Sequence, residues 1–296
     1  MQYVIENAAY IENGQKEKLS FMIKDNEFRY IGPNISYHNV MKMEASTFLI
    51  TPSYIFFAPD LPEFPFEQFK AKFLNEYVLK GCGTIITNFT INRISEFDQA
   101  LRRKRMSLLN SPVDFLLGIQ INAKLITTDL IRKCKREKIP IIFVEITKMK
   151  ELYSIPWGWI RDISFPLNPI FIPIFTSELK LFSEKMLLQK WTTLLEDEKI
   201  VHLPSPLQKN KPLSIDIIKK IGLYPKKGIL KVGGELSYNL FFMKKDDEQR
   251  RGYPYGVDLY PDVSVHKGKY VSINQVPIFR SGTGEELIIH KTAIFV

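Results

Sequence analysis

The central part of the chain alternates apolar runs with amphipathic helices, and this alternation constrains the fold more than any other feature. Apolar runs rich in β-branched and aromatic residues favour strands, and they occur at 54–57, 84–89, 113–119 and 141–146. Between them, apolar residues recur at helical spacing, in 66–80, 94–108 and 128–137. Strands that are apolar along their whole length and alternate with helices form parallel sheets buried on both faces. The sequence therefore predicts an α/β fold built from βαβ units.

The pattern weakens after residue 146. Short strands are expected at 157–163, 169–175 and 199–203, and helices at 177–196 and 215–221. The chain ends differ from this central part, because they consist of short apolar or alternating segments separated by turns. Neither end has enough strands to close a core alone, so we expect the two ends to form one small β-sandwich.

These observations divide the 296-residue chain into two domains, which suits its length and its 45% hydrophobic content. The β-domain takes residues 1–52 and 222–296, and the α/β domain takes residues 53–221. The charged segment 244–255 is expected to be a surface insertion of the β-domain.

Short motifs near both ends of the chain carry a family resemblance. Residues 51–55, Thr-Pro-Ser-Tyr-Ile, match the first half of a Thr-Pro-Gly-Phe-Ile-Asp-x-His-x-His pattern that leads into a barrel. Residues 222–233, Gly-Leu-Tyr-Pro-Lys-Lys-Gly-Ile-Leu-Lys-Val-Gly, closely resemble the segment with which dihydropyrimidinases and dihydroorotases leave that barrel. The chain is thus similar to the cyclic-amidohydrolase branch of the amidohydrolase superfamily. The resemblance implies a TIM-like (β/α) barrel and a β-domain made from both termini.

The barrel is expected either to have lost some of its units or to have very short ones. A complete (β/α)8 barrel takes about 250 residues, and the stretch from Ser53 to Ile221 has room for about five or six units of roughly 30 residues each. An incomplete barrel leaves unpaired strand edges, which need a cover. A partner subunit or the long helix after Ser177 would supply one. We therefore expect a homo-oligomer, with a two-fold dimer favoured.

The resemblance also implies a metal site, for which this chain lacks the ligands. Amidohydrolases hold one or two metal ions mainly with barrel histidines, often with a carboxylated lysine as bridge. Here Ala58 and Asp60 stand at the positions of the first histidine pair, and residues 141–146 contain no lysine. None of the four histidines lies between residues 40 and 201; they are His38, His202, His266 and His290. We therefore expect no metal ion and no other cofactor.

Two carboxylates and one histidine remain as candidate catalytic residues. Asp60 follows the first barrel strand, Glu145 lies near the carboxyl end of the fourth, where barrel enzymes carry catalytic groups, and His202 follows the long helix. A divalent metal held by Asp60 and Glu145 is conceivable, because hard cations bind carboxylate oxygens. The simpler interpretation is a loop hydrogen bond for Asp60, an ion pair for Glu145 and a packed ring for His202.

Charge, cysteines and hydropathy restrict the partners. The net charge is +9, but the basic clusters at 102–105 and 132–138 lie late in expected helices, where positive charge complements the helix dipole. No aromatic residues interleave with them to stack on bases, so nucleic acid is not an expected partner. Cys82 and Cys134 are expected to be free, packed thiols. The chain has neither a basic signal region at its start nor an apolar run of about 18 residues, so we expect a cytoplasmic protein that does not enter membranes.

Three functional hypotheses remain. The favoured one is a degenerate, metal-free amidohydrolase-like protein that keeps the fold for binding, scaffolding or regulation and has lost catalysis. The alternative is a divergent hydrolase that cleaves carbon–nitrogen bonds of cyclic amides, as dihydroorotases do, with carboxylates in place of histidines. The third is a basic nucleic-acid-binding module. Metal content and hydrolytic activity distinguish the first two, and the salt dependence of binding tests the third.

Overall fold

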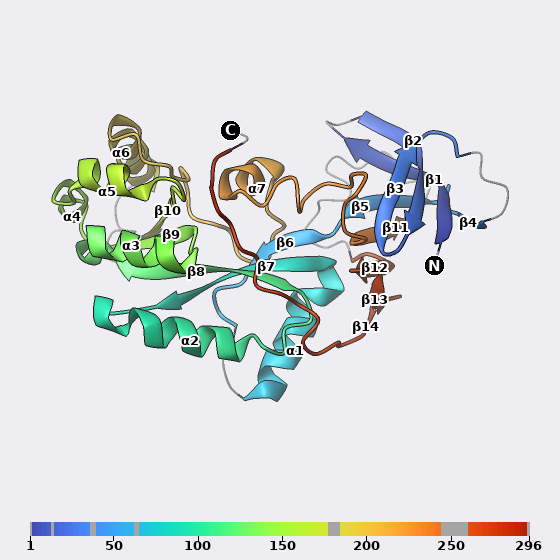
Figure 1. The fold of residues 1–296 in the computed structure, drawn as a ribbon, viewed down its shortest axis with the longest axis horizontal. Coiled ribbons are helices and arrows are strands. Elements are labelled where there is room, and N and C mark those ends of the chain that lie inside the picture. The colour runs from blue at the N-terminus through green and yellow to red at the C-terminus, as the bar shows by residue number, and fades with distance from the viewer. Residues whose placement is uncertain are drawn as a thin grey trace.

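The computed structural model describes residues 2–12, 15–35, 40–61, 65–176, 184–243 and 260–294 (Figure 1). Three features expected from the sequence therefore lie wholly or partly outside the described residues. They are His38, the charged insertion 244–255 and the first part of the helix expected at 177–196.

A five-stranded parallel sheet forms the centre of the α/β part, as the apolar runs predicted, in the order β10-β9-β8-β7-β6. The sheet curls into half a barrel (Figure 1). Its strands are β6 (Tyr54–Phe57), β7 (Cys82–Thr90), β8 (Asp114–Asn122), β9 (Ile141–Ile146) and β10 (Ile170–Phe175).

Helices alternate with these strands along the chain, and short 3₁₀ turns lie at 78–80, 94–96 and 123–125. The side chain of Thr127 caps α3 by accepting a hydrogen bond from the N–H of Leu130 (3.3 Å). The helices are α1 (Phe66–Glu76), α2 (Phe97–Ser107), α3 (Thr128–Glu137), α4 (Lys150–Tyr153), α5 (Trp157–Ser164), α6 (Glu184–Asp197) and α7 (Ile215–Ile221). In the described residues, each of these helices is too short or too polar to cross a membrane.

Two strands expected after residue 146 are wrong. Residues 157–163 form helix α5, because Trp157, Ile160 and Ser164 are buried at spacings of three and four, which is a helical period. Residues 199–203 are reduced to one isolated bridge, between His202 and Phe171 of β10.

The two faces of the parallel sheet are packed differently, because neighbouring residues of a strand point to opposite sides. In β9, Ile142 and Val144 pack with the helix-side core, whereas Ile141 and Phe143 belong to an inner-face core. The inner-face core also contains Ile218 and other residues of α7, which lies across the sheet from α1 and α2 (Figure 1). The concave side of the half-barrel is therefore filled by the chain itself.

The chain also covers both edges of the parallel sheet. At the β10 edge, the N–H of Leu203 donates to the carbonyl of Phe171 (2.9 Å). At the β6 edge, the N–H of Leu213 donates to the carbonyl of Ile55 (2.9 Å). Residues 200–213 thus connect one edge to the other. A short segment of the chain itself therefore contacts both edges of the parallel sheet.

The two chain ends meet in one nine-stranded mixed sheet, in which β5 pairs parallel with β1 and antiparallel with β11. Because β5 joins the two sets of strands, the two chain ends form a single hydrogen-bonded sheet within one β-rich part of the fold. The strands are β1 (Gln2–Glu12), β2 (Gln15–Lys24), β3 (Glu27–Gly32), β4 (Met41–Glu44), β5 (Phe48–Pro52), β11 (Tyr238–Phe242), β12 (Val263–His266), β13 (Lys269–Ile273) and β14 (Val276–Pro277).

The described end of the chain leaves this mixed sheet and runs along the half-barrel. The N–H of Phe115 donates to the carbonyl of Glu285 (2.9 Å), and the N–H of Leu287 donates back to the carbonyl of Phe115 (2.8 Å). A side chain at Gly284 would place its Cβ 1.8 Å from the carbonyl oxygen of Val113, so only glycine fits this approach. The tail therefore ties the two parts of the fold together.

Candidate functional site

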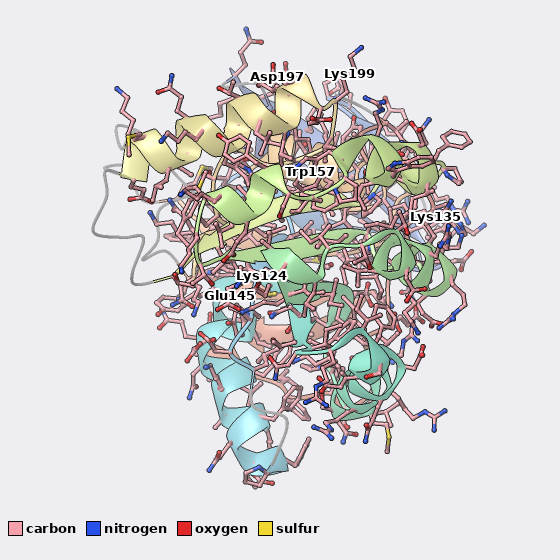
Figure 2. The ribbon with its side chains drawn as sticks, turned by 90° about the vertical axis from the view of Figure 1, so that its left-hand side faces the viewer. Lys124, Lys135, Glu145, Trp157, Asp197 and Lys199 are labelled. Carbon is pink, nitrogen blue, oxygen red and sulfur yellow. The ribbon has the colours of Figure 1, made fainter. Side chains whose placement is uncertain are left out.

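Polar side chains gather on the inner face where the parallel strands end. They are Asn88 of β7, Gln120 and Asn122 of β8, Glu145 of β9, and Thr147, which lies two residues after Glu145 in the sequence. The amide of Asn88 donates to Oε1 of Gln120 (2.9 Å), and the amide of Asn122 donates to Oγ1 of Thr147 (3.3 Å). The strands of Figure 1 run toward the side that faces the viewer in Figure 2, where Glu145 is labelled.

Two polar groups remain available to a ligand at the carboxyl ends of these strands, which are called the carboxyl edge from here on. Asn88 is 8% exposed, and its Oδ1 has no hydrogen-bond partner among the described residues. Glu145 is half-buried and forms no ion pair or side-chain hydrogen bond within the described part of the chain. The amides were not predicted, although polar residues at alternate positions late in apolar strands could have indicated them.

Ala58 and Asp60, which stand at the family's first histidine pair, do not converge on this edge. Ala58 is fully buried in the helix-side core, whereas Ile55 and Phe57 face the inner core. Asp60 is 58% exposed and forms an ion pair with Lys209, while Lys72 donates to its backbone carbonyl (2.8 Å). A histidine placed at position 58 would therefore enter the helix-side core.

The inner face itself is occupied by large apolar side chains. Phe57 and Phe143 stack with their ring centroids 4.9 Å apart. Phe143 lies on β9, two residues before Glu145. A Cβ at Gly118 would lie 2.6 Å from the Phe143 ring, so glycine leaves room for that ring. The packing continues through Ile55, Ile86, Leu116, Ile141, Ile170, Ile172, Leu203, Leu207, Ile218, Ile221, Leu223 and Ile289.

The metal that the resemblance implies does not fit these residues. Ala58 has no ligand atom, Asp60 is paired with Lys209, and Glu145 is left as a single carboxylate at the edge. Within the described ranges, no group of three or more His, Cys, Asp or Glu side chains could hold a metal ion. One carboxylate and neutral amides offer hydrogen-bonding groups instead of a ligand set for a transition metal.

His202 lies apart from both carboxylates, at the β10 edge. Its Nδ1 is 2.9 Å from the carbonyl of Ile200, and its ring meets Trp191 edge-on at 6.4 Å. Burial lowers the pKa of the imidazole, which favours the neutral ring. His202 is therefore placed as the packed, hydrogen-bonded histidine of the simpler interpretation.

The two cysteines are free and buried, as expected. Burial raises the pKa of the Cys82 thiol and of the Cys134 thiol. Since the thiolate is the nucleophile, neither residue is suited to nucleophilic catalysis at neutral pH.

A buried ionic cluster lies at the opposite end of the sheet, where β8 begins. Lys227 Nζ is 2.6 Å from Asp114 Oδ2 and 2.8 Å from Glu235 Oε1. Lys267 Nζ is 2.7 Å from Asp114 Oδ1 and 3.0 Å from Glu285 Oε2. These residues and His266, whose Nε2 is 3.8 Å from Asp114 Oδ1, are called the junction cluster. The cluster joins the half-barrel to the segment that leaves it and to the C-terminal tail.

The electrostatics of the junction cluster favour its charged form. Burial raises the pKa of the Asp114 carboxyl, but His266 and the ammonium group of Lys227 lower it more, so the pKa lies well below its usual range. Burial lowers the pKa of Lys267, but the hydrogen bond and charge of Asp114 raise it more. An acid at the start of an otherwise apolar strand was the sequence signal for this cluster, and it was missed.

The depressed pKa of Asp114 predicts a pH dependence of stability. The carboxylate stabilises the fold fully above its unfolded pKa of about 3.8, and the contribution is lost as the pH falls further toward the folded pKa. The difference in unfolding free energy between wild type and Asp114→Asn should therefore be constant from about pH 5 to 7 and shrink below about pH 4. Urea unfolding at each pH measures it. A difference that stays constant down to pH 3 would contradict the assignment.

Comparison with known proteins finds solved structures that share this fold. No protein-family model matches the sequence, and no curated protein matches it. Among solved structures, D-hydantoinase from Thermus sp. superposes with a TM-score of 0.70 at 12% identity, covering 99% of this chain and 100% of that one. L-hydantoinase from Arthrobacter aurescens gives 0.63 at 11% identity, with 95% and 98% covered. Dihydropyrimidinase from Brevibacillus agri gives 0.60 at 10% identity, with 98% and 99% covered.

These structures agree with the family that the motifs at residues 51–55 and 222–233 indicated. The identities are low, and the parallel sheet has five strands in the described residues. The chain therefore has the fold of the hydantoinases and dihydropyrimidinases, in a shortened and divergent form of the amidohydrolase architecture that its sequence resembles.

Proposed function

We propose that this protein is a catalytically inactive relative of the amidohydrolases, which uses the fold for binding, scaffolding or regulation. The observation that carries the proposal is the filled inner face. Phe57 and Phe143 stack where the strands approach their carboxyl ends, and α7 packs against the same face. Hydrolysis of a cyclic amide by a barrel enzyme needs a group that activates a water molecule, and the apolar side chains of this face supply none.

The carboxyl edge supports binding better than catalysis. Its available groups are the acceptor Oδ1 of Asn88 and the carboxylate of Glu145, beside neutral amides. Amide groups recognise a ligand by hydrogen bonding but do not shift protons at neutral pH. Loss of the histidines and retention of a polar edge are together consistent with a binding role.

Metal content is the first test of this proposal. The purified protein should hold no stoichiometric zinc, nickel, manganese or iron, because the edge lacks converging ligands. Elemental analysis measures this.

In parallel, the protein should not hydrolyse dihydroorotate, hydantoin, dihydrouracil or allantoin, with or without added divalent metal. The double variant Ala58→His, Asp60→His should remain inactive, because position 58 faces the helix-side core.

The alternative is a divergent hydrolase of cyclic amides, favoured by the hydantoinase fold and by Glu145, which has no ion-pair partner among the described residues. About one equivalent of a transition metal per chain, lost together with a hydrolytic activity in Asp60→Ala or Glu145→Ala, would establish the alternative. Glu198→Ala, which removes a carboxylate near the end of α6, is the matched control and should change neither quantity.

Self-association and nucleic-acid binding complete the proposal. We propose a two-fold homo-oligomer, which light scattering at high protein concentration tests. Binding to nucleic acid should be weak, non-specific and steeply reduced by salt, since it would rest on charge alone. Sequence-selective binding at physiological salt would favour the basic nucleic-acid-binding module instead.

A further inference from the structure

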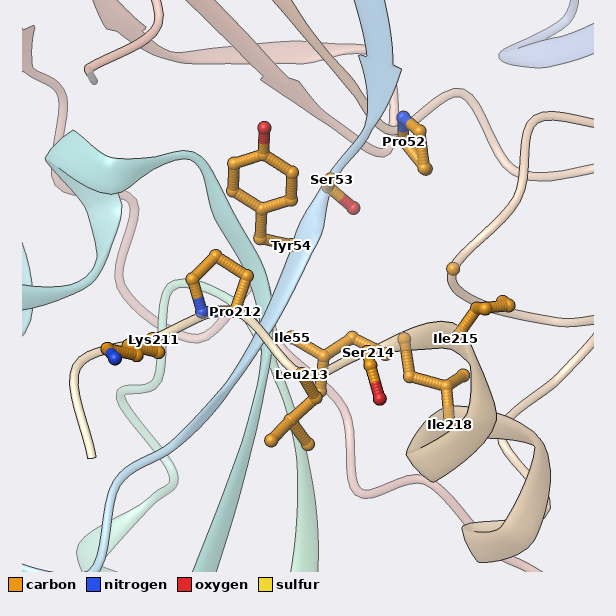
Figure 3. Close-up of a pocket in the computed structure, with 11 residues that line it drawn as sticks. Pro52, Ser53, Tyr54, Ile55, Lys211, Pro212, Leu213, Ser214, Ile215 and Ile218 are labelled. Carbon is orange, nitrogen blue, oxygen red and sulfur yellow. The ribbon is translucent and has the colours of Figure 1, made fainter. Parts of the chain in front are cut away.

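A pocket of about 420 Å³ lies where the two parts of the fold meet (Figure 3). It is at the amino end of β6, between the last residue of β5 and the start of α7, and so away from the carboxyl edge described above. Its volume is in the range of cavities that hold small organic ligands. It is lined by Pro52, Ser53, Tyr54, Ile55, Lys211, Pro212, Leu213, Ser214, Ile215, Ile218 and Gly228.

The walls of this junction pocket are mostly apolar. Ile215 and Ile218 of α7 form one side, and Ser53 and Ile55 lie across from them (Figure 3). Gly228 keeps part of the wall open, because a Cβ there would approach the methyl groups of Ile218 to 3.1 Å. Its φ of +85° also disfavours any other residue. A hydrocarbon body placed here would bury apolar surface on several sides.

The polar groups of the junction pocket are few, and Lys211 is the charged residue among those that line it. The hydroxyl groups of Ser53 and Ser214 have no hydrogen-bond partner among the described residues. Lys211 lines the pocket, but its side chain extends away from Ser53, Ile215 and Ile218 (Figure 3). The pocket thus offers hydroxyl groups to a ligand and no aligned charge, which disfavours an ionised molecule, because burying an unpaired charge is unfavourable.

We propose that the junction pocket binds one small, uncharged and mainly hydrocarbon molecule that carries a single hydroxyl group. The apolar walls hold the hydrocarbon body, and Ser53 or Ser214 hydrogen-bonds the ligand oxygen. This site is independent of the carboxyl edge, so it stands whether or not the protein has lost catalysis.

Menthol and p-menthane form a matched pair of probes, because they share a ten-carbon body and differ in one hydroxyl group. Methyl NMR of the full-length protein, with Ile55, Ile215 and Ile218 assigned by single Ile→Val variants, reports on the pocket directly. Menthol should shift these three methyl groups in a saturable, one-to-one titration. p-Menthane should shift the same groups with about fivefold weaker affinity, the loss expected for one net hydrogen bond.

Three variants make the proposal falsifiable. Ser53→Ala, Ser214→Ala should remove the advantage of menthol over p-menthane without changing the apolar walls. Ile215→Trp should fill the pocket and abolish both titrations, whereas Asp216→Trp, on the next residue of α7 and outside the lining, should leave both unchanged. Shifts that stay linear in probe concentration, an unaltered menthol advantage in the double alanine variant, or binding that survives Ile215→Trp would overturn the proposal.

Discussion

Replacing Asp114 by alanine should lower the free energy of unfolding by about 3–5 kcal/mol, as expected when one partner of a buried ion pair is removed. Asp114 is 1% exposed and accepts contacts from both Lys227 and Lys267. Its loss leaves Lys227, 8% exposed, with Glu235 alone and deprives Lys267 of its closer carboxylate. Urea unfolding at pH 7 measures the change.

The matched control is Asp162→Ala, which removes an exposed aspartate of α5. Asp162 is 66% exposed and lies 3.5 Å from Arg161, so its ion pair is screened by solvent. This variant should change the free energy of unfolding by less than about 1 kcal/mol. If the two variants are equally stable, the junction cluster does not hold the half-barrel to the C-terminal tail.

Local patterns were sufficient to predict the parallel sheet. The apolar run at 141–146 coincides with β9. Its side chains point alternately to the two faces of the sheet, and both faces are covered, so the strand is apolar along almost its whole length. The turn at Asp25 and Asn26 is likewise a local feature, because both residues have positive φ and residues of these two types tolerate a left-handed backbone. Such features depend on neighbours in sequence.

Features that depend on distant residues were not predicted. Asp114 and Lys227 are 113 positions apart, so no local pattern relates them. The segment 157–163 was mistaken for a strand because it is short and rich in tryptophan and isoleucine. In so short an apolar run, helical spacing and strand alternation cannot be told apart. At the candidate site, the motif located Ala58 and Asp60, but only the structure shows that Ala58 faces the helix-side core.

The second large effect is expected at the inner face. Phe143→Ala should lower the free energy of unfolding by about 3–5 kcal/mol, because a fully enclosed aromatic ring is lost and a cavity is left. Phe143 is 1% exposed, stacks on Phe57 and fits the space above Gly118. The neighbours are held by strands and by α7, so they cannot collapse fully into the gap. Urea unfolding, followed by tryptophan fluorescence, measures the loss.

Phe165→Ala is the control, because Phe165 is 66% exposed at the end of α5 and its removal should change the free energy of unfolding by about 0.5 kcal/mol or less. The proposed function adds a second readout. If the inner face is a structural core, Phe143→Ala should lose stability without gaining metal or hydrolytic activity, since the cavity it opens is lined by apolar groups. A variant as stable as wild type would show that this face is loosely packed and able to admit a substrate, and the binding-only proposal would then lose its main support.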